Sequence, residues 1–198
     1  MLGKWLASII TTAGRLLQDF LAAQDPAPAA PPHTFQQQWQ PPDSQNYKAN
    51  FDAAVFKATN SAGIGVIIKD CDGEVFGALS LPIPLSQSVD ELEALACRRA
   101  VRFAWEIGLS RVTFKGDSAT VIQAITRSDS DFLPFGNIID DIRHLVSAFQ
   151  FSDFCHVNCG CNIVADALAK RAKLCEGMQV WLECLPEDIS PLVFFDVP

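Results

Sequence analysis

From residue 47 onward the chain alternates between two hydrophobic periods. Runs of alternating or continuous apolar residues are typical of strands, and apolar residues that recur every three or four positions are typical of helices. Asp72-Gly73 lies between two strand-like runs and predicts a tight hairpin. Ser88 and Glu91 have the spacing of a capping box, and Gly108 ends the helix that they begin. We expect strands over residues 48–56, 62–69, 74–80, 111–115 and 151–158, and helices over 88–107, 118–127, 137–149 and 162–174.

The first 45 residues have a different pattern. Over residues 1–23, apolar side chains recur at three- and four-residue spacing, which predicts an amphipathic helix whose apolar face needs a partner surface. Three roles stay open for this helix: binding a protein partner, lying on a membrane surface, which its two basic residues favour least, or being a relic of a longer upstream protein. Charged and polar residues interrupt this stretch, so we expect neither a membrane span nor a signal peptide. Residues 24–45 are rich in proline and glutamine and predict an extended linker. We therefore place one folded domain at 46–175 and expect the tail, 176–198, to pack on or beside it.

Composition narrows the class of protein. Of the 198 residues, 49% are hydrophobic and 19% are charged, which is enough apolar material for a packed core. The net charge of −8 has the wrong sign for binding nucleic acid by bulk electrostatics, so a polyanion would have to be held by metal ions or by a local patch. The seven cysteines are scattered and odd in number, which favours a reducing intracellular compartment, nucleus or cytoplasm, over a secreted disulfide framework.

Acidic residues stand out at positions where the pattern predicts burial. Asp52 lies in the middle of an apolar strand, where a charge is costly unless it is paired or bound to metal. Asp117 directly follows a strand, at the end where functional groups gather in α/β sheets. Glu93 and Asp166 share helix faces with small or apolar residues. We expect these four carboxylates to meet at one edge of the sheet.

Four carboxylates so close together need a positive counter-charge. Two Mg²⁺ or Mn²⁺ ions would supply it, because these ions prefer oxygen ligands, and such a pair catalyses phosphodiester hydrolysis. Simpler roles stay open: Asp52 as a strand-edge acid, Asp117 as a helix cap, and the other two as solvated helix residues. A zinc site over residues 155–161 is disfavoured, because its Cys and His residues form one crowded run instead of two separated ligand pairs.

Five motifs, in one order along the chain, resemble a known family. They are Lys48-x-Asn-Phe-Asp-x-Ala, Gly63-x-Gly-Val-Ile-Ile-Lys-Asp-x-x-Gly73, Glu93-Ala-Leu-Ala-x-x-x-Ala100, Gly116-Asp-Ser118 and Asn162-x-Val-Ala-Asp-Ala-Leu-Ala-Lys170. Over residues 46–175 the chain is similar to the type 1 ribonuclease H family, in its plant, retroelement-derived reverse-transcriptase-like branch. The resemblance implies a mixed five-stranded α/β sheet with helices on both faces and cleavage of the RNA strand of RNA–DNA hybrids. It also implies that Asp52, Glu93, Asp117 and Asp166 are catalytic and hold two metal ions.

The same resemblance identifies further site residues and some departures from the pattern. It places Asn162, Ser118 and Ala53 where nucleic acid is bound, although Ala53 stands where the branch usually has glycine. In the loop before the last helix, where the family offers a His or Arg, the accessory candidates are His156 and Cys159. These departures keep two alternatives open: a weak or inactive domain that binds nucleic acid or protein, and a purely structural module.

Overall fold

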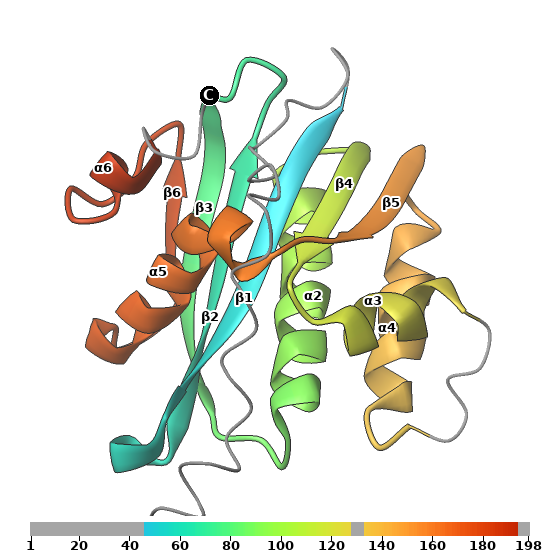
Figure 1. Cartoon of the computed structure of the whole chain (residues 1–198). Coiled ribbons are helices and arrows are strands. Elements are labelled where there is room, and N and C mark those ends of the chain that lie inside the picture. Colours follow the sequence, from blue (N-terminus) through green and yellow to red (C-terminus); the bar gives the residue numbers. More distant parts are fainter. Residues whose placement is uncertain (1–45, 128–132, 194–198) are drawn as a thin grey trace, which may run out of the picture. The chain divides into compact units, whose positions relative to one another are not determined.

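The computed structural model of the chain describes residues 46–127 and 133–193 (Figure 1). The predicted N-terminal helix and the predicted linker lie outside the described residues, so the structure does not test them or a partner of the helix. Every helix of the described part is too short or too polar to cross a membrane.

A mixed sheet organises the domain, with the strand order β5-β4-β1-β2-β3-β6. The first three strands form an antiparallel meander, β4 and β5 run parallel to β1, and β6 pairs antiparallel with β3. The hairpin predicted at Asp72-Gly73 is confirmed, and Gly73 has a positive φ of 84°. The strands are β1 (Tyr47–Phe56), β2 (Ser61–Lys69), β3 (Val75–Pro84), β4 (Arg111–Gly116), β5 (Phe151–His156) and β6 (Gln179–Leu182).

Two details of the sheet differ from the prediction. The sheet has six strands and not five, because β6, from the predicted tail, adds a short strand at the edge. The third strand also runs four residues past Ser80, through two prolines, to Pro84. Since β6 pairs with β3 only between Gly77 and Ser80, the rest of β3 is an edge, where proline is tolerated in a strand.

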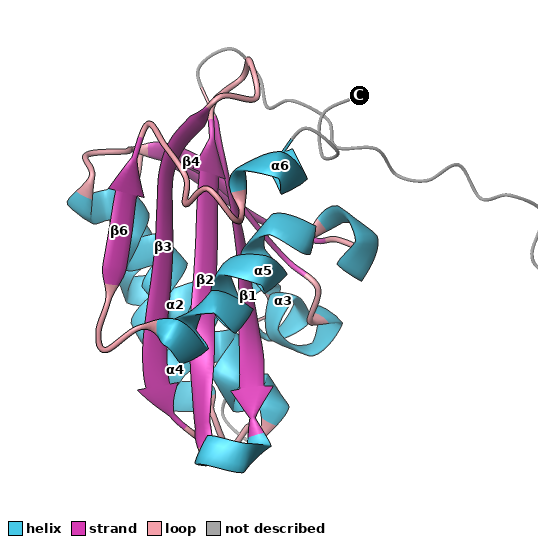
Figure 2. Ribbon diagram, turned by 90° about the vertical axis from the view of Figure 1, so that its left-hand side faces the viewer, coloured by secondary structure: helices cyan, strands magenta, loops and turns pink. Residues whose placement is uncertain are grey.

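Helices cover both faces of the sheet, as predicted (Figure 2). α2 lies with α3 and α4 on one face, and α5 with α6 on the other. The capping box at the start of α2 is present: the Ser88 hydroxyl accepts a hydrogen bond from the Glu91 amide at 3.1 Å, and the Glu91 carboxylate accepts one from the amide of Gln87. The helices are α2 (Val89–Glu106), α3 (Ala119–Thr126), α4 (Gly136–Val146), α5 (Ile163–Arg171) and α6 (Ser190–Val193), with 3₁₀ turns at Lys57–Thr59, Cys159–Cys161 and Ala172–Leu174.

Each face of the sheet has its own hydrophobic core. The larger core lies under α2 and α4 and includes Phe51, Phe103 and Phe114, which are all buried. The smaller core lies between α5 and the sheet. Gly65 allows α5 to come this close: a Cβ at this position would lie 2.1 Å from the backbone oxygen of Ala165. The two facing backbones therefore fix the position of α5.

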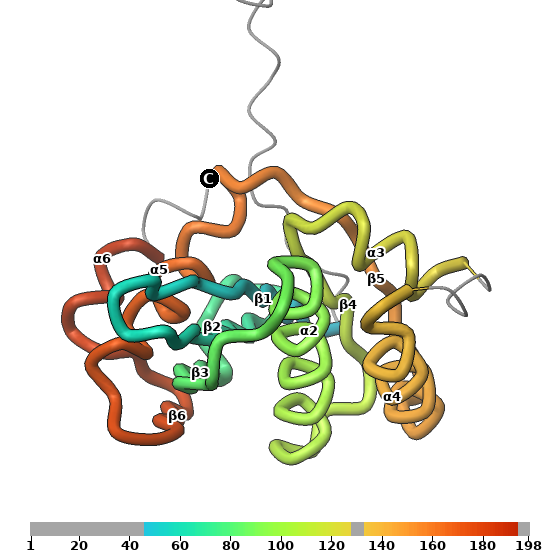
Figure 3. Tube along the Cα trace, turned by 90° about the horizontal axis from the view of Figure 1, so that it is seen from below, coloured from blue at the N-terminus to red at the C-terminus, as the bar shows by residue number. Residues whose placement is uncertain are grey.

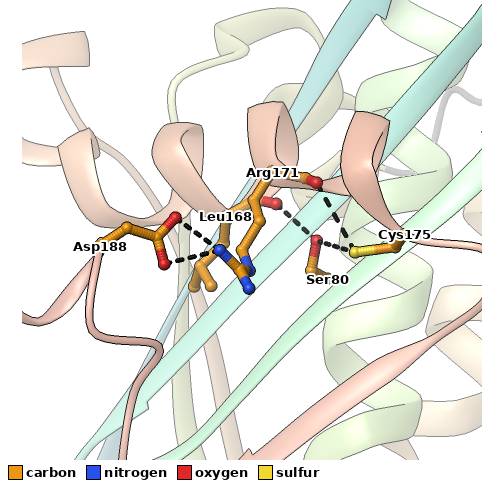
Figure 4. Close-up of polar contacts among 5 residues, drawn as sticks. All are labelled: Ser80, Leu168, Arg171, Cys175 and Asp188. Carbon is orange, nitrogen blue, oxygen red and sulfur yellow. Dashed lines mark hydrogen bonds and ion pairs between the residues drawn. The ribbon is translucent and has the colours of Figure 1, made fainter.

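The segment after α5 completes the smaller core. Ile189 is 4% exposed and packs in this core, with Trp181 against it. Arg171, at the end of α5, donates to both carboxylate oxygens of Asp188, one of them at 2.6 Å (Figure 4). The guanidinium of Arg171 also lies 5.6 Å from the ring centroid of Trp181. Arg171 thus ties α5 to both β6 and the chain that follows it.

Candidate metal centre

Three of the four predicted carboxylates meet in the structure. Asp52, Glu93 and Asp117 each offer an oxygen, and these oxygens all lie within 4.8 Å of one another. Among residues 46–127 and 133–193 this is the one group of three or more His, Cys, Asp or Glu side chains with metal-binding geometry. The run of Cys and His at 155–161, which is also described, forms no such group.

The sheet itself brings the group together. The parallel pairing of β1 with β4 ends at Asn50 and Lys115, so the two strands part just before Asp52 and Asp117. By strand alternation, Asp52 lies on the same face as Asn50, whose side chain contacts the residues before α5. Glu93 lies on α2, which covers the opposite face of the sheet. Its side chain joins the group beyond the last paired residues of β1 and β4, where the two strands have separated.

Burial and mutual repulsion dominate the electrostatics of the group. Asp52 is 7% exposed and Glu93 is 6% exposed. Burial, and then the charge of Asp117, raises the pKa of Asp52 from 3.8 to about 7. Burial, and then the charges of Asp52 and Asp117, raises the pKa of Glu93 from 4.5 to about 9. The positive charge around these carboxylates is too small to offset their burial and mutual repulsion, so the pKa values of Asp52 and Glu93 rise.

The hydrogen bonds of the group fit a divalent cation. The Ala53 amide donates to Oδ1 of Asp52 at 2.8 Å. Oε2 of Glu93 is buried and has no hydrogen-bond partner among the described residues. A buried carboxylate oxygen without a donor is costly in a folded protein, and an oxygen-preferring cation such as Mg²⁺ would satisfy it.

Asp166 lies near the group but does not belong to it. It is in the first turn of α5, and its carboxylate accepts a hydrogen bond from Lys170, one helical turn later, at 2.6 Å. After burial and Asp117, the charge of Asp166 adds to the raised pKa of Asp52, whereas Lys170 lowers it. The Asp166 side chain is 38% exposed, so it lies at the rim of the site while Asp52 and Glu93 lie at its base.

The residues predicted to bind nucleic acid have identifiable contacts within the protein. Asn162 is 2% exposed, and its amide donates to the Phe51 carbonyl at 2.9 Å. Its Oδ1 accepts from the Asn50 side chain at 3.0 Å, which joins the start of α5 to β1. Ser118 caps α3 by accepting from the amide of Val121, and Ala53 is half-buried. Their contact with nucleic acid stays a prediction.

Asn50 is a residue that sequence reasoning missed. It is buried and polar in an apolar strand, two positions before Asp52 and on the same face. The sequence contains a signal for Asn50: two polar residues at positions i and i+2 of an apolar strand lie on the same face of the sheet, next to each other.

The two accessory candidates lie on the Asp117 side of the group. The Nε2 atom of His156 is 3.0 Å from the backbone oxygen of Asp117. Cys159 is exposed, and a hydrogen bond with the Asp117 side chain raises the pKa of its thiol. Both residues are therefore placed to influence Asp117, while their part in any reaction stays a prediction.

The raised pKa values predict how stability depends on pH. Asp52 and Glu93 bind protons more tightly in the folded than in the unfolded protein. Their contribution to stability is therefore complete below about pH 4 and is lost as the pH rises to about 9. In EDTA, we expect the urea midpoint to fall over this range. Glu93→Gln is expected to flatten the decline above pH 7, and a decline parallel to that of wild type would contradict the assignment.

Comparison with known proteins adds a family and a fold. The model of a family described as reverse transcriptase-like matches residues 50–172. The RNase H1 of Halobacterium salinarum is 25% identical, with a TM-score of 0.57 over 65% of this chain and 97% of that chain.

Two other solved structures share the fold at lower identity. LC11-RNase H1, solved in complex with an RNA/DNA hybrid, is 22% identical, with a TM-score of 0.57 over 64% of this chain and 95% of that one. The N-terminal RNase H domain of a Mycobacterium tuberculosis protein is 20% identical, with a TM-score of 0.58 over 65% and 94%. No curated protein matches the chain.

Proposed function

The chain belongs to the reverse transcriptase-like family, and we propose that it hydrolyses the RNA strand of RNA–DNA hybrids. The observation that carries this proposal is the group of Asp52, Glu93 and Asp117, held within 4.8 Å on a ribonuclease H fold. The narrower resemblance to the plant branch stays a prediction.

The positions and the exposure of the four acids suggest which role each would have in metal binding. Asp52 and Asp117, which lie where β1 and β4 separate, would hold both divalent ions, and Glu93 and Asp166 would each help to hold one of them. When bound, Mg²⁺ or Mn²⁺ supplies the positive charge that activates water and stabilises the leaving oxygen. Asp117 and Asp166 are more exposed than the other two, so the hybrid would approach from their side.

Lys170 affects the charge of two of the proposed metal ligands, Asp166 and Asp52. It neutralises Asp166 in the described structure, and it also lowers the pKa of Asp52. Lys170 contacts only Oδ2 of Asp166, so Oδ1 would be able to bind a metal ion with the ion pair intact, whereas binding through Oδ2 would exchange the Lys170 ammonium for the ion. That exchange costs little, because both side chains are substantially exposed and exposed ion pairs are weak.

A second candidate function is a domain that binds nucleic acid or protein without cutting. The observation that favours it is Cys159, which lies beside Asp117. The type 1 ribonuclease H family, which the chain resembles, commonly has arginine at this position. A neutral thiol cannot provide the positive charge that an arginine brings to a phosphate. The net charge of −8 points in the same direction.

The seven cysteines support a proposal about compartment. All of them are free thiols in the structure, and Cys97 is fully buried. Free cysteines in this number are typical of a reducing environment, and we place the protein in the nucleus or cytoplasm on that basis.

A cleavage assay tests the enzyme against the binder. The full chain is incubated at low salt with an RNA–DNA hybrid labelled on the RNA strand, first in Mg²⁺ and then in Mn²⁺. We expect cleavage of the RNA strand in at least one metal and none in EDTA, with a DNA duplex left intact. Protein that has a native circular dichroism spectrum but cleaves in neither metal would replace the nuclease proposal with the binder.

A further inference from the structure

A cavity of about 430 Å³ lies between α2 and the β2–β3 side of the sheet. Its apolar walls include Ile64, Leu81, Ile83 and Leu95. Its volume is within the range of natural small-molecule sites, which usually combine apolar walls with a few polar groups.

The cavity is separate from the carboxylate group. Both sites involve α2, but on opposite sides of the helix. At about 100° per residue, Leu95, Arg98 and Arg102 lie roughly 140° to 200° around the axis from Glu93. The body of α2 therefore stands between the two sites, and a ligand in the cavity would not touch the metal ligands.

The cavity lies where α2 stops covering the sheet. α2 packs against β1, β2 and β4, and Figure 3 shows it on the β1–β4 side, with β3 and β6 away from it. On the same face, Val180 and Leu182 of β6 pair with β3 and are 42% and 55% exposed. Leu81 and Ile83, which line the cavity, belong to the part of β3 that lies beyond its pairing with β6, so the cavity lies at an edge of the sheet.

Three arginines of α2 line the cavity: Arg98, Arg99 and Arg102. Arg98 donates to Asp141 at 2.8 Å, and Arg99 forms two hydrogen bonds with Glu106, at 2.9 and 2.7 Å. Arg102 is exposed and forms no ion pair within the described residues. Arg102 is not isolated, because its charge, after the hydrogen bond and the charge of Arg99, lowers the pKa of Glu106. The three guanidinium groups thus share two carboxylates, Asp141 and Glu106, which leaves one positive charge in excess.

Arg99 is the more buried of the two ion-paired arginines that line the cavity, and one of its donors is unsatisfied. Its side chain is 12% exposed, and its Nε atom is buried without a hydrogen-bond partner among the described residues. A buried donor of a charged group is normally satisfied, because leaving it unpaired is costly. This buried atom is out of reach of a ligand in the cavity, but an anion beside the guanidinium groups of Arg99 and Arg102 would neutralise the remaining positive charge.

We propose that this cavity binds a small apolar monoanion, with a hydrocarbon or aromatic body against Leu81, Ile83 and Leu95 and an acidic group at Arg99 and Arg102. One unbalanced guanidinium matches one negative charge, and the apolar walls match a ligand body without further polar groups. In a protein of net charge −8, binding an anion requires such a local excess of positive charge. The proposal does not depend on the nuclease activity.

Two fluorescent probes that differ only in charge test the proposal on the full chain. 8-Anilinonaphthalene-1-sulfonate carries an aromatic body and one sulfonate, and N-phenyl-1-naphthylamine has the same body without the sulfonate. We expect saturable binding of the sulfonate at one site, about tenfold tighter than that of the neutral probe. Arg102→Gln is expected to remove this preference by weakening only the sulfonate, and Arg102→Lys to restore part of it.

Lys173→Gln is the matched control, because it removes one exposed positive charge outside the cavity. It should leave both affinities unchanged, and near-ultraviolet circular dichroism should show the same fold in all variants. Equal affinities of the two probes, or the same loss in Arg102→Gln and Lys173→Gln, would overturn the proposal. Displacement of the sulfonate probe by a 12-nucleotide DNA strand, but not by dodecanoate, would also overturn it and identify a nucleic-acid contact instead.

Discussion

Asp52→Asn is expected to lower the rate of hybrid cleavage in Mg²⁺ about a thousandfold or more. Asp52 lies at the base of the carboxylate group, and under the proposed function it is shared by both metal ions. Asparagine has nearly the same shape but no negative charge, so it keeps the packing of β1 and loses most of the affinity for a divalent cation. Single-turnover cleavage of the labelled hybrid measures the effect.

The same substitution should make the metal-free protein more stable. Burial and the charge of Asp117 raise the pKa of Asp52 to about 7, so the ionised carboxylate destabilises the folded state at pH 8. In EDTA at that pH, we expect the thermal midpoint of Asp52→Asn to lie about 5 °C or more above that of wild type. Lost activity together with raised stability is typical of a functional site and is not expected of a structural residue.

Asp72→Asn provides the matched control, because it is the same chemical change at an exposed position of the β2–β3 turn. It should leave both the cleavage rate and the thermal midpoint within error of wild type. If Asp52→Asn cleaved the hybrid at the wild-type rate, Asp52 would have no part in metal binding and the proposed mechanism would fail.

Gly65→Ala is expected to destabilise the protein by about 3 kcal/mol, the upper part of the range for inserting a methyl group into a packed core. The new Cβ would lie 2.1 Å from the Ala165 carbonyl oxygen and 2.3 Å from the Ala169 amide nitrogen, both of them backbone atoms of α5. Backbone atoms cannot rotate away as a side chain can, so α5 must move off the sheet as a unit. Thermal unfolding should show a midpoint roughly 6 to 12 °C lower.

Gly160→Ala is the control for Gly65→Ala, because a Cβ at position 160 would meet no atom within 4 Å. We expect it to change the midpoint by less than about 1 °C. An equally stable Gly65→Ala protein would show that α5 does not pack on β2 as closely as described.

The local parts of the fold were predictable because their signals are local. The hairpin at Asp72-Gly73 depends on a five-residue turn, 70–74, and the start of α2 depends on the contact between Ser88 and Glu91. The sixth strand lacks such a signal. It has four residues, and two of its apolar side chains, Val180 and Leu182, are exposed, so its pairing with β3 depends on the rest of the sheet.

The candidate site was predictable in its residue types but not in its geometry. Acids in apolar segments pointed to Asp52 and Glu93, and both are buried. The sequence pattern could not show that these two residues come from opposite faces of the sheet, because that depends on where β1 and β4 separate. Nor could it show that Asp166 pairs with Lys170, since a helical i, i+4 pair and a metal ligand have the same sequence signal.

The contacts of Arg171 bear on where this domain begins and ends as a folding unit. The family match stops at residue 172, but the hydrophobic layer under α5 is closed by Ile189, and the sheet gains a strand at Gln179–Leu182. A recombinant protein that ends at residue 172 would lack Trp181, Asp188 and Ile189. Leu168 and the α5-facing side of β3 would then be open to water, and Arg171 would lose its partner Asp188. We therefore expect the shortest version of this domain that folds on its own to extend to residue 193, about twenty residues beyond the end of the family match.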